Sequence, residues 1–292
     1  MSRFGLITYE ALPQLQDDDR LLLAALAGRG HDARPAIWTD TSIDWRAFDA
    51  LVLRSCWDYH LLPGAFRHWL DVIEAAGVQL FNAPAIARWN MDKFYLRELA
   101  SHGVGTVPTR FFEPGAFVSM RELREATGWG DVIVKPAVSA TAWRLARVAN
   151  GDELPDDVRG AMTTDRYLAQ PFMPQIADGE WSLIFFGGRF SHAVLKRPQA
   201  GEFRVQEEYG GAAIALPPPD GFIEAASRAL AAAPGDPLYA RVDGIAYEDG
   251  FMLIELELLE PALYLGTSAG AADRFAAAIE RAGRPVKTTF TH

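Results

Sequence analysis

The chain has 292 residues with an ordinary globular composition, 49% hydrophobic and 23% charged. Its formal charge of -10, from 28 basic and 38 acidic residues, argues against a nucleic-acid or anionic-membrane surface. A single cysteine, Cys56, excludes an internal disulfide and a cysteine zinc site. The N-terminus lacks a signal-peptide pattern, and no apolar run is long enough to span a bilayer, so we expect a cytoplasmic protein.

The first 88 residues alternate strands with helices. Strands are expected over 3–10, 33–38, 48–55 and 78–84, and helices over 17–31 and 63–77. This alternation predicts a parallel sheet, whose ligands bind beyond the carboxyl ends of its strands. The segment "RSCWDYH" (54–60) follows the third strand, so we expect it to hold a substrate through Arg54, Ser55, Trp57 and Asp58.

The pattern changes after a helix expected over 90–103. From residue 107 to 170, short strands are separated by turn residues, with a helix near 119–127, which indicates a small α+β unit. The remaining residues, 171–292, contain several strands and two helices, near 220–233 and 271–283. The fold class is therefore α/β followed by α+β.

A hairpin is expected in "RVDGIAYEDGFMLIELELLEP" (241–261). A three-residue loop, 248–250, would pair Asp243 with Glu255 and Arg241 with Glu257, and the glycine at its third position suits that loop. All four side chains would then share one face. The carboxylates suit a magnesium ion that bridges to phosphates. The alternative is a surface hairpin with solvated charges.

Three other segments carry weaker signals. "DVIVKPAVSATAW" (131–143) places Lys135 at a strand end before a small-residue loop with Ser139 and Thr141, which suits a phosphate as well as a plain strand end. "YLAQPFMP" (167–174) is a strand interrupted by proline, where freed backbone groups could bind adenine. "KRPQAGEFRVQEEYGG" (196–211) is a cationic stretch that faces either phosphate or solvent.

Taken in order, these pieces resemble the ATP-grasp superfamily, and within it the prokaryotic glutathione synthetase-like group. "NAPAIARWNMDK" is similar to the segment that ends in a nucleotide-binding lysine, here Lys93, and "VIVKP" supplies the second, Lys135. "AQPFMPQIADGE" resembles the adenine hinge. "RVDG" and "IELELLEP" resemble the metal strands. The implied nucleotide site comprises Lys93, Lys135, Ser139, Thr141, Gln170, Pro171, Phe172, Met173 and, near the ribose, Glu180. The implied metal ligands are Asp243, Glu255 and Glu257.

The resemblance implies three domains: a pre-grasp substrate domain (1–88), a lid domain (89–170) and a metal-binding catalytic domain (171–292). Two departures stand out. The usual glutamate-apolar-asparagine pair reads Glu-Leu-Glu, and the phosphate loop "AVSATAWRL" contains no glycine. "RSCWDY" and "RWNMDKFYL" also resemble a branch that includes the O-ureidoserine cyclo-ligase of cycloserine biosynthesis.

The resemblance implies an ADP-forming ligase that uses ATP and two Mg²⁺ ions, with Mn²⁺ as an alternative. A substrate carboxyl would become an acyl phosphate and then join a nitrogen nucleophile, with Arg204 and Arg241 stabilising the developing charge. The partner would be an amino-acid-like small molecule, with no nucleic acid and no membrane; a homo-oligomer is left open. The rivals are a grasp-type kinase and a non-catalytic nucleotide-binding module. A dinucleotide oxidoreductase lacks its G-x-G-x-x-G after the first strand.

Overall fold

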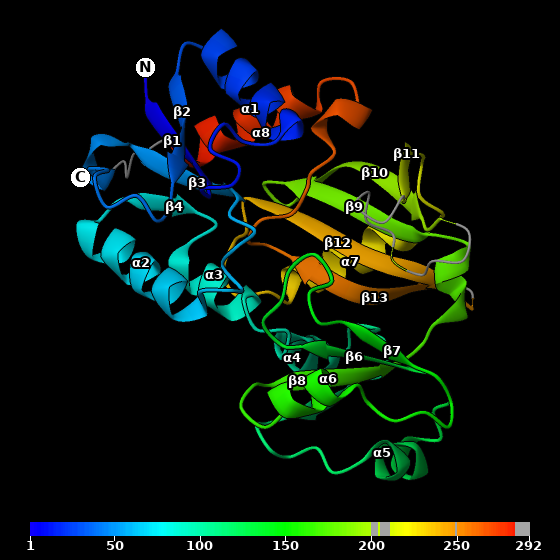
Figure 1. The fold of residues 1–292 in the computed structure, drawn as a ribbon. Helices are drawn as coiled ribbons and strands as arrows, with labels where there is room; N and C mark the ends of the chain where they lie inside the picture. Colours follow the sequence, from blue (N-terminus) through cyan, green and yellow to red (C-terminus); the bar gives the residue numbers. More distant parts are fainter. Residues whose placement is uncertain (200–203, 205–210, 249, 284–292) are drawn as a thin grey trace, which may run out of the picture.

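The computed structural model describes residues 1–199, 204, 211–248 and 250–283. Three sheets follow one another along the chain (Figure 1). The first is parallel, in the order β2-β1-β3-β4, and the other two are antiparallel, in the orders β5-β8-β6-β7 and β11-β10-β9-β12-β13. The predicted combination of a parallel α/β unit with α+β units is confirmed.

The parallel sheet and its helices come from the first 81 residues. They are β1 (Arg3–Thr8), α1 (Asp17–Gly28), β2 (Asp32–Ile37), the 3-10 turn η1 (Trp45–Ala47), β3 (Ala50–Ser55), α2 (Pro63–Ala76) and β4 (Gln79–Phe81). Side chains alternate across the strands, so Ile7 and Leu53 face Phe66 of α2, whereas Leu6 and Val52 face the other layer. That other layer combines α1 with α8.

The middle sheet is preceded by two short helices where one long helix was expected over 90–103. These helices are α3 (Pro84–Asn90) and α4 (Tyr95–Ser101). The chain between them turns at 91–94, where the backbone N–H of Lys93 donates to Ala137 O at 2.8 Å. The unit then contains β5 (Arg110–Phe112), α5 (Met120–Thr127), β6 (Val132–Pro136), β7 (Ala146–Val148), α6 (Asp156–Ala161) and β8 (Tyr167–Pro171).

The C-terminal sheet forms one wall of a large cavity. Its elements are η2 (Pro174–Ala177), β9 (Glu180–Phe186), β10 (Arg189–Arg197), β11 (Ala212–Ala215), α7 (Phe222–Ala231), β12 (Tyr239–Tyr247), β13 (Gly250–Glu257), η4 (Leu265–Thr267) and α8 (Ala271–Ala282). One face of this sheet packs on α3, α4 and α7 through a shared core that includes Leu96, Leu183 and Leu230. Part of the opposite face packs on α8 through Ile184, Phe186 and Phe275, and the rest borders the cavity.

The last described helix returns to the start of the chain. Phe275 and Ile279 of α8 share a core with Phe4, Leu22 and Leu26, and α1 and α8 lie side by side (Figure 1). The N-terminal and C-terminal units therefore pack directly against each other, although they lie at opposite ends of the described chain. In the described part of the chain, no helix is long and apolar enough to cross a bilayer.

Candidate active site

A cavity of about 670 Å³ lies between the N-terminal unit, the middle sheet and the C-terminal sheet. Trp57 lines it from the N-terminal unit, Lys135 and Gln170 from the middle sheet, and Asp243 and Glu255 from the C-terminal sheet. The cavity therefore collects residues as far apart in the sequence as Leu12 and Thr267.

The hairpin has the predicted pairs but a different turn. Asp243 pairs with Glu255 and Arg241 with Glu257. Tyr247 pairs with Gly250, so two residues rather than three lie between the strands. The register is restored by a bulge, because Gly244 pairs with Leu253 and Ile254 is the extra residue. The predicted three-residue loop is thus wrong.

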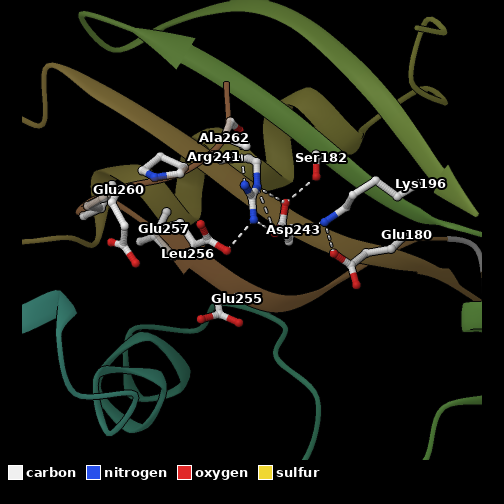
Figure 2. A network of polar contacts seen from close by, with 12 residues as sticks. Glu180, Ser182, Lys196, Arg241, Asp243, Glu255, Leu256, Glu257, Glu260 and Ala262 are labelled. Carbon is white, nitrogen blue, oxygen red and sulfur yellow. Dashed lines mark hydrogen bonds and ion pairs between the residues drawn. The ribbon is translucent and has the colours of Figure 1, made fainter. Parts of the chain in front are cut away.

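Asp243 is the centre of a dense polar network on β12 (Figure 2). Arg241 donates from Nη2 to Asp243 Oδ2 at 2.8 Å, Lys196 Nζ lies 3.3 Å from the same oxygen, and Ser182 Oγ donates to Oδ1 at 2.5 Å. Burial opposes ionisation, but Arg241 and Lys196 outweigh it and lower the pKa of Asp243 to about 2. Lys196 also forms an ion pair with Glu180.

The two glutamates of β13 are unequally neutralised. Glu255 Oε1 lies 3.2 Å from Lys93 Nζ, and Lys93 together with Lys135 lowers its pKa against the opposing effect of burial. Glu257 pairs with Arg241, yet burial and its acidic neighbours raise its pKa to about 7. The extra carboxylate of the Glu-Leu-Glu motif is therefore only partly compensated by protein cations.

These residues fit a divalent cation by chemistry and by charge. Carboxylate oxygens are the ligands that Mg²⁺ prefers. Burial and the neighbouring carboxylates of Asp243 and Glu255 raise the pKa of Glu257 although Arg241 opposes them, so a further cation here would be favoured. No group of three acidic, histidine or cysteine side chains in the described ranges forms a ready-made metal cluster. A bound metal would therefore replace part of the contact of Arg241 and Lys196 with Asp243.

The two predicted nucleotide lysines meet beside the glycine-free loop. Lys93 Nζ donates to Ser139 O at 2.6 Å, and Ser139 Oγ donates to Pro136 O at 3.1 Å. Lys135 lines the cavity, and burial together with Lys93 lowers its pKa, although Glu255 opposes this. Thr141 also lines the cavity, with φ of 49° in the left-handed region. The loop thus makes a tight turn without glycine.

The predicted adenine hinge forms part of the cavity wall. Gln170, Pro171, Phe172 and Met173 all line it. Gln170 Nε2 donates to Thr109 Oγ1 at 3.0 Å. The backbone N–H of Phe172 donates to Asp131 O at 2.9 Å, so proline does not leave that donor free as expected. Glu180, expected near a ribose, lines the same cavity but pairs with Lys196.

Of the predicted substrate residues, Trp57 lines the cavity and the others do not. Arg54 and Ser55 are fully buried: Arg54 Nε donates to Asp19 Oδ1 at 2.8 Å and Ser55 Oγ donates to Asp19 Oδ2 at 2.7 Å. Asp58 accepts from Trp38 Nε1 at 2.8 Å. Their polar groups already have partners, which argues against the predicted direct contact with a substrate.

Arg204, predicted to face the reacting groups, lines the cavity. Its neighbours, 200–203 and 205–210, lie outside the described residues, together with most of the "KRPQAGEFRVQEEYGG" segment.

The cavity also contains polar residues that the predicted site omitted, including Asp17 and Asp18 of α1. Lys196, Glu260 and Tyr264 also line the cavity. Lys196 is the second-last residue of β10, and alternation along that strand could have placed it with the acidic face of the sheet. Glu260 and Tyr264 lie in an irregular segment after β13, where alternation no longer applies.

An antiparallel sheet that holds acidic side chains, a second sheet that supplies a lysine and a hinge, and a cavity between them define the class of this protein. It has the ATP-grasp fold, and its homologues are ligases of this fold that use ATP with a divalent metal. Residues 4–82 match the family described as the N-terminal domain of the D-cycloserine synthetase DcsG.

Similarity to one protein extends over the whole chain. The cycloserine biosynthesis protein DcsG of Streptomyces lavendulae is 29% identical over 98% of this chain and 100% of its own length. A crystal structure of D-cycloserine synthetase DcsG superposes with a TM-score of 0.84, at 27% identity, over 97% of this chain and 100% of that one. A D-alanine–D-alanine ligase of Bacillus anthracis shares the fold, with a TM-score of 0.72 at 15% identity and 97% coverage of both chains.

Proposed function

We propose that this protein closes the ring of cycloserine from O-ureidoserine in an ATP-dependent, ADP-forming reaction. The observation that carries the proposal is the similarity to DcsG over the full length of both chains, including the N-terminal unit. That unit supplies Trp57 to the cavity.

The reaction needs positioning and charge stabilisation rather than a protein nucleophile. The substrate carboxylate attacks the γ-phosphorus of ATP, ADP leaves, and an acyl phosphate forms. The nitrogen bonded to the side-chain oxygen then attacks the acyl carbon, and phosphate leaves as the ring closes. The carbamoyl group on that nitrogen must also be lost to water before cycloserine itself is released.

The chain's own residues have separable roles in this scheme. Lys93 and Lys135 would neutralise phosphate oxygens, since both are buried beside the small-residue loop with Ser139 and Thr141. Gln170 to Met173 would hold the adenine, and Glu180 would lie near the ribose.

Asp243, Glu255 and Glu257 would hold two Mg²⁺ ions, with Mn²⁺ as the alternative metal. A bound divalent cation would screen the negative charge of the β- and γ-phosphates. Arg241, released in part from Asp243, would then stabilise the charge that develops on the transferred phosphoryl group, together with Arg204.

The test is to incubate the purified protein with ATP, Mg²⁺ and each enantiomer of O-ureidoserine and to separate the products by chromatography. The proposal expects ADP, free phosphate and cycloserine in step. A stable phosphorylated substrate without free phosphate would instead indicate a kinase. Absence of ADP with either enantiomer would refute the proposed substrate.

A further inference from the structure

The irregular segment after β13, residues 258–263, is held by side chains at every backbone carbonyl. Six successive carbonyl oxygens, those of Leu258, Leu259, Glu260, Pro261, Ala262 and Leu263, accept in turn from Asn82 Nδ2 (2.7 Å), Tyr239 Oη (2.8 Å), Trp57 Nε1 (3.0 Å), Arg54 Nη2 (2.7 Å), Arg241 Nη1 (3.1 Å) and His192 Nε2 (2.9 Å). This segment belongs to no regular helix or strand, yet each of its backbone carbonyl oxygens accepts a hydrogen bond from a different side chain.

The donors come from both ends of the chain, and most are deeply buried. Arg54 and Asn82 belong to the first 82 residues, whereas Tyr239 and Arg241 belong to β12. Arg54 is 0% exposed and forms an ion pair with Asp19, which is equally buried. Burying an ion pair is costly, so this scaffold fixes the segment more firmly than packing alone requires.

The scaffold presents a single polar side chain. The segment reads Leu-Leu-Glu-Pro-Ala-Leu, and its three leucines are buried in the core. Glu260 is half-buried and lines the cavity. Within the described ranges, its carboxylate makes no hydrogen bond or ion pair, in contrast to Asp243, Glu255 and Glu257.

A carboxylate in this position lacks a cation. Burial and the charges of Glu257 and Glu255 raise the pKa of Glu260 to about 8, although Lys93 and Arg241 oppose them. Figure 2 shows Glu260 beyond Glu257, at the opposite end of the row from Lys196 and Glu180. Its backbone carbonyl is held by Trp57, which itself lines the cavity from the N-terminal unit. Glu260 thus lies toward the part of the cavity that the N-terminal unit builds.

We propose that Glu260 binds the ammonium group of an amino-acid substrate and makes the enzyme selective for substrates that carry one. This inference rests on the proposed function, because it assigns a ligand to one end of the same cavity. A carboxylate that has no partner among the described residues suits a single charge-assisted hydrogen-bond donor. The proposed metal ligands lie on β12 and β13, whereas Glu260 lies beyond the end of β13, where Trp57 holds its backbone carbonyl.

The decisive experiment compares two substrates in two proteins. The substrates are O-ureidoserine and its desamino analogue, which lacks the ammonium group, and the proteins are the wild type and Glu260→Gln. The amide has nearly the same shape as the carboxylate but no charge. We expect Glu260→Gln to lower kcat/KM for O-ureidoserine by about 10- to 100-fold, the usual loss of a hydrogen bond to a charged group, and to leave the desamino analogue unchanged. Selectivity between the two substrates should therefore collapse.

Two controls separate the alternatives. Glu224→Gln changes an exposed carboxylate on α7 and should leave both substrates as in the wild type. Calorimetric binding of a non-hydrolysable ATP analogue, titrated with Mg²⁺, should be the same in the wild type and Glu260→Gln. An equal loss for both substrates, or weaker Mg²⁺-dependent nucleotide binding, would overturn the ammonium site while leaving the proposed function standing. A wild type that forms no ADP with O-ureidoserine would overturn the proposed function and this inference with it.

Discussion

The molecule contains two buried arginine–aspartate pairs of nearly equal geometry in very different settings. Arg54 lies 2.8 Å from Asp19, and Arg241 lies 2.8 Å from Asp243. In the first pair, Ser55 donates to the other carboxylate oxygen of Asp19, and Arg54 donates to the carbonyl oxygen of Pro261. Both charges therefore have protein partners and are buried away from the cavity. The second pair faces the cavity beside further carboxylates that the protein's cations only partly neutralise.

The comparison teaches that burial of a charged pair does not by itself indicate a site. What distinguishes the second pair is unbalanced charge next to open volume, which a ligand can complete. Neutralising the first pair should therefore reduce the stability of the protein, whereas neutralising the second pair should reduce its activity.

Neutralising the closed pair should give the largest effect. Asp19→Asn leaves the charge of Arg54 fully buried without a counter-ion, which we expect to cost about 3–5 kcal/mol of unfolding free energy. Chemical denaturation measures this loss. Asp220→Asn, at an exposed position, is the control and should leave the unfolding midpoint unchanged. A loss for Asp19→Asn no greater than for this control would show that the pair does not hold the N-terminal unit together.

Neutralising the open pair should reduce catalysis. Asp243→Asn removes a proposed metal ligand, so we expect phosphate release to fall by about 100-fold or more, as for one preorganised electrostatic contact. The same variant should remain folded, because Glu257 still accepts from Arg241. If Asp243→Asn unfolded like Asp19→Asn while the folded fraction kept full activity, the distinction between the two pairs would fail.

The sequence predicts the open pair well and the closed pair poorly. Alternation places Arg241 with Asp243 and Glu255 with Glu257, but the two pairs share one face only because the bulge at Ile254 offsets the two-residue turn. The rule for parallel strand ends locates Arg54 near a ligand-binding edge, but it does not say which way the side chain points. Its partner lies on α1, 35 positions away, and only the folded chain brings the two together.

The remaining misses have the same physical origin. Glu260 follows the last residue of β13, where the period of two ends and tertiary contacts alone orient the side chain. The packing of α8 against α1 likewise depends on apolar surface contributed by both ends of the chain. Local pattern predicts elements and faces, whereas contacts between distant segments require the structure.

The unbalanced charge should appear in the pH dependence of stability. Glu257 and Glu260 have pKa values raised from 4.5 to about 7 and about 8, so the folded protein retains protons that the unfolded chain has lost. Stability is then highest below the unfolded pKa and is lost as pH rises through the folded values. The melting temperature of the ligand-free protein should fall between about pH 5 and pH 8, the interval that these two shifts span. Differential scanning calorimetry of Glu260→Gln should show a smaller fall of the melting temperature with pH. An unchanged dependence on pH would show that burial does not raise the pKa of Glu260.

The smallest effect should come from removing one of the hydrogen bonds that hold the backbone carbonyls of residues 258–263. Trp57→Phe keeps an aromatic side chain but removes the indole N–H that donates to Glu260 O at 3.0 Å. An unsatisfied carbonyl costs about 1 kcal/mol, so we expect a several-fold rise in the KM for O-ureidoserine with little change in kcat. Steady-state kinetics with both substrates distinguishes this from a general loss of packing. If the KM for O-ureidoserine rises more than that for its desamino analogue, Trp57 acts by positioning the carboxylate, and an equal rise for both would assign Trp57 to the cavity wall alone.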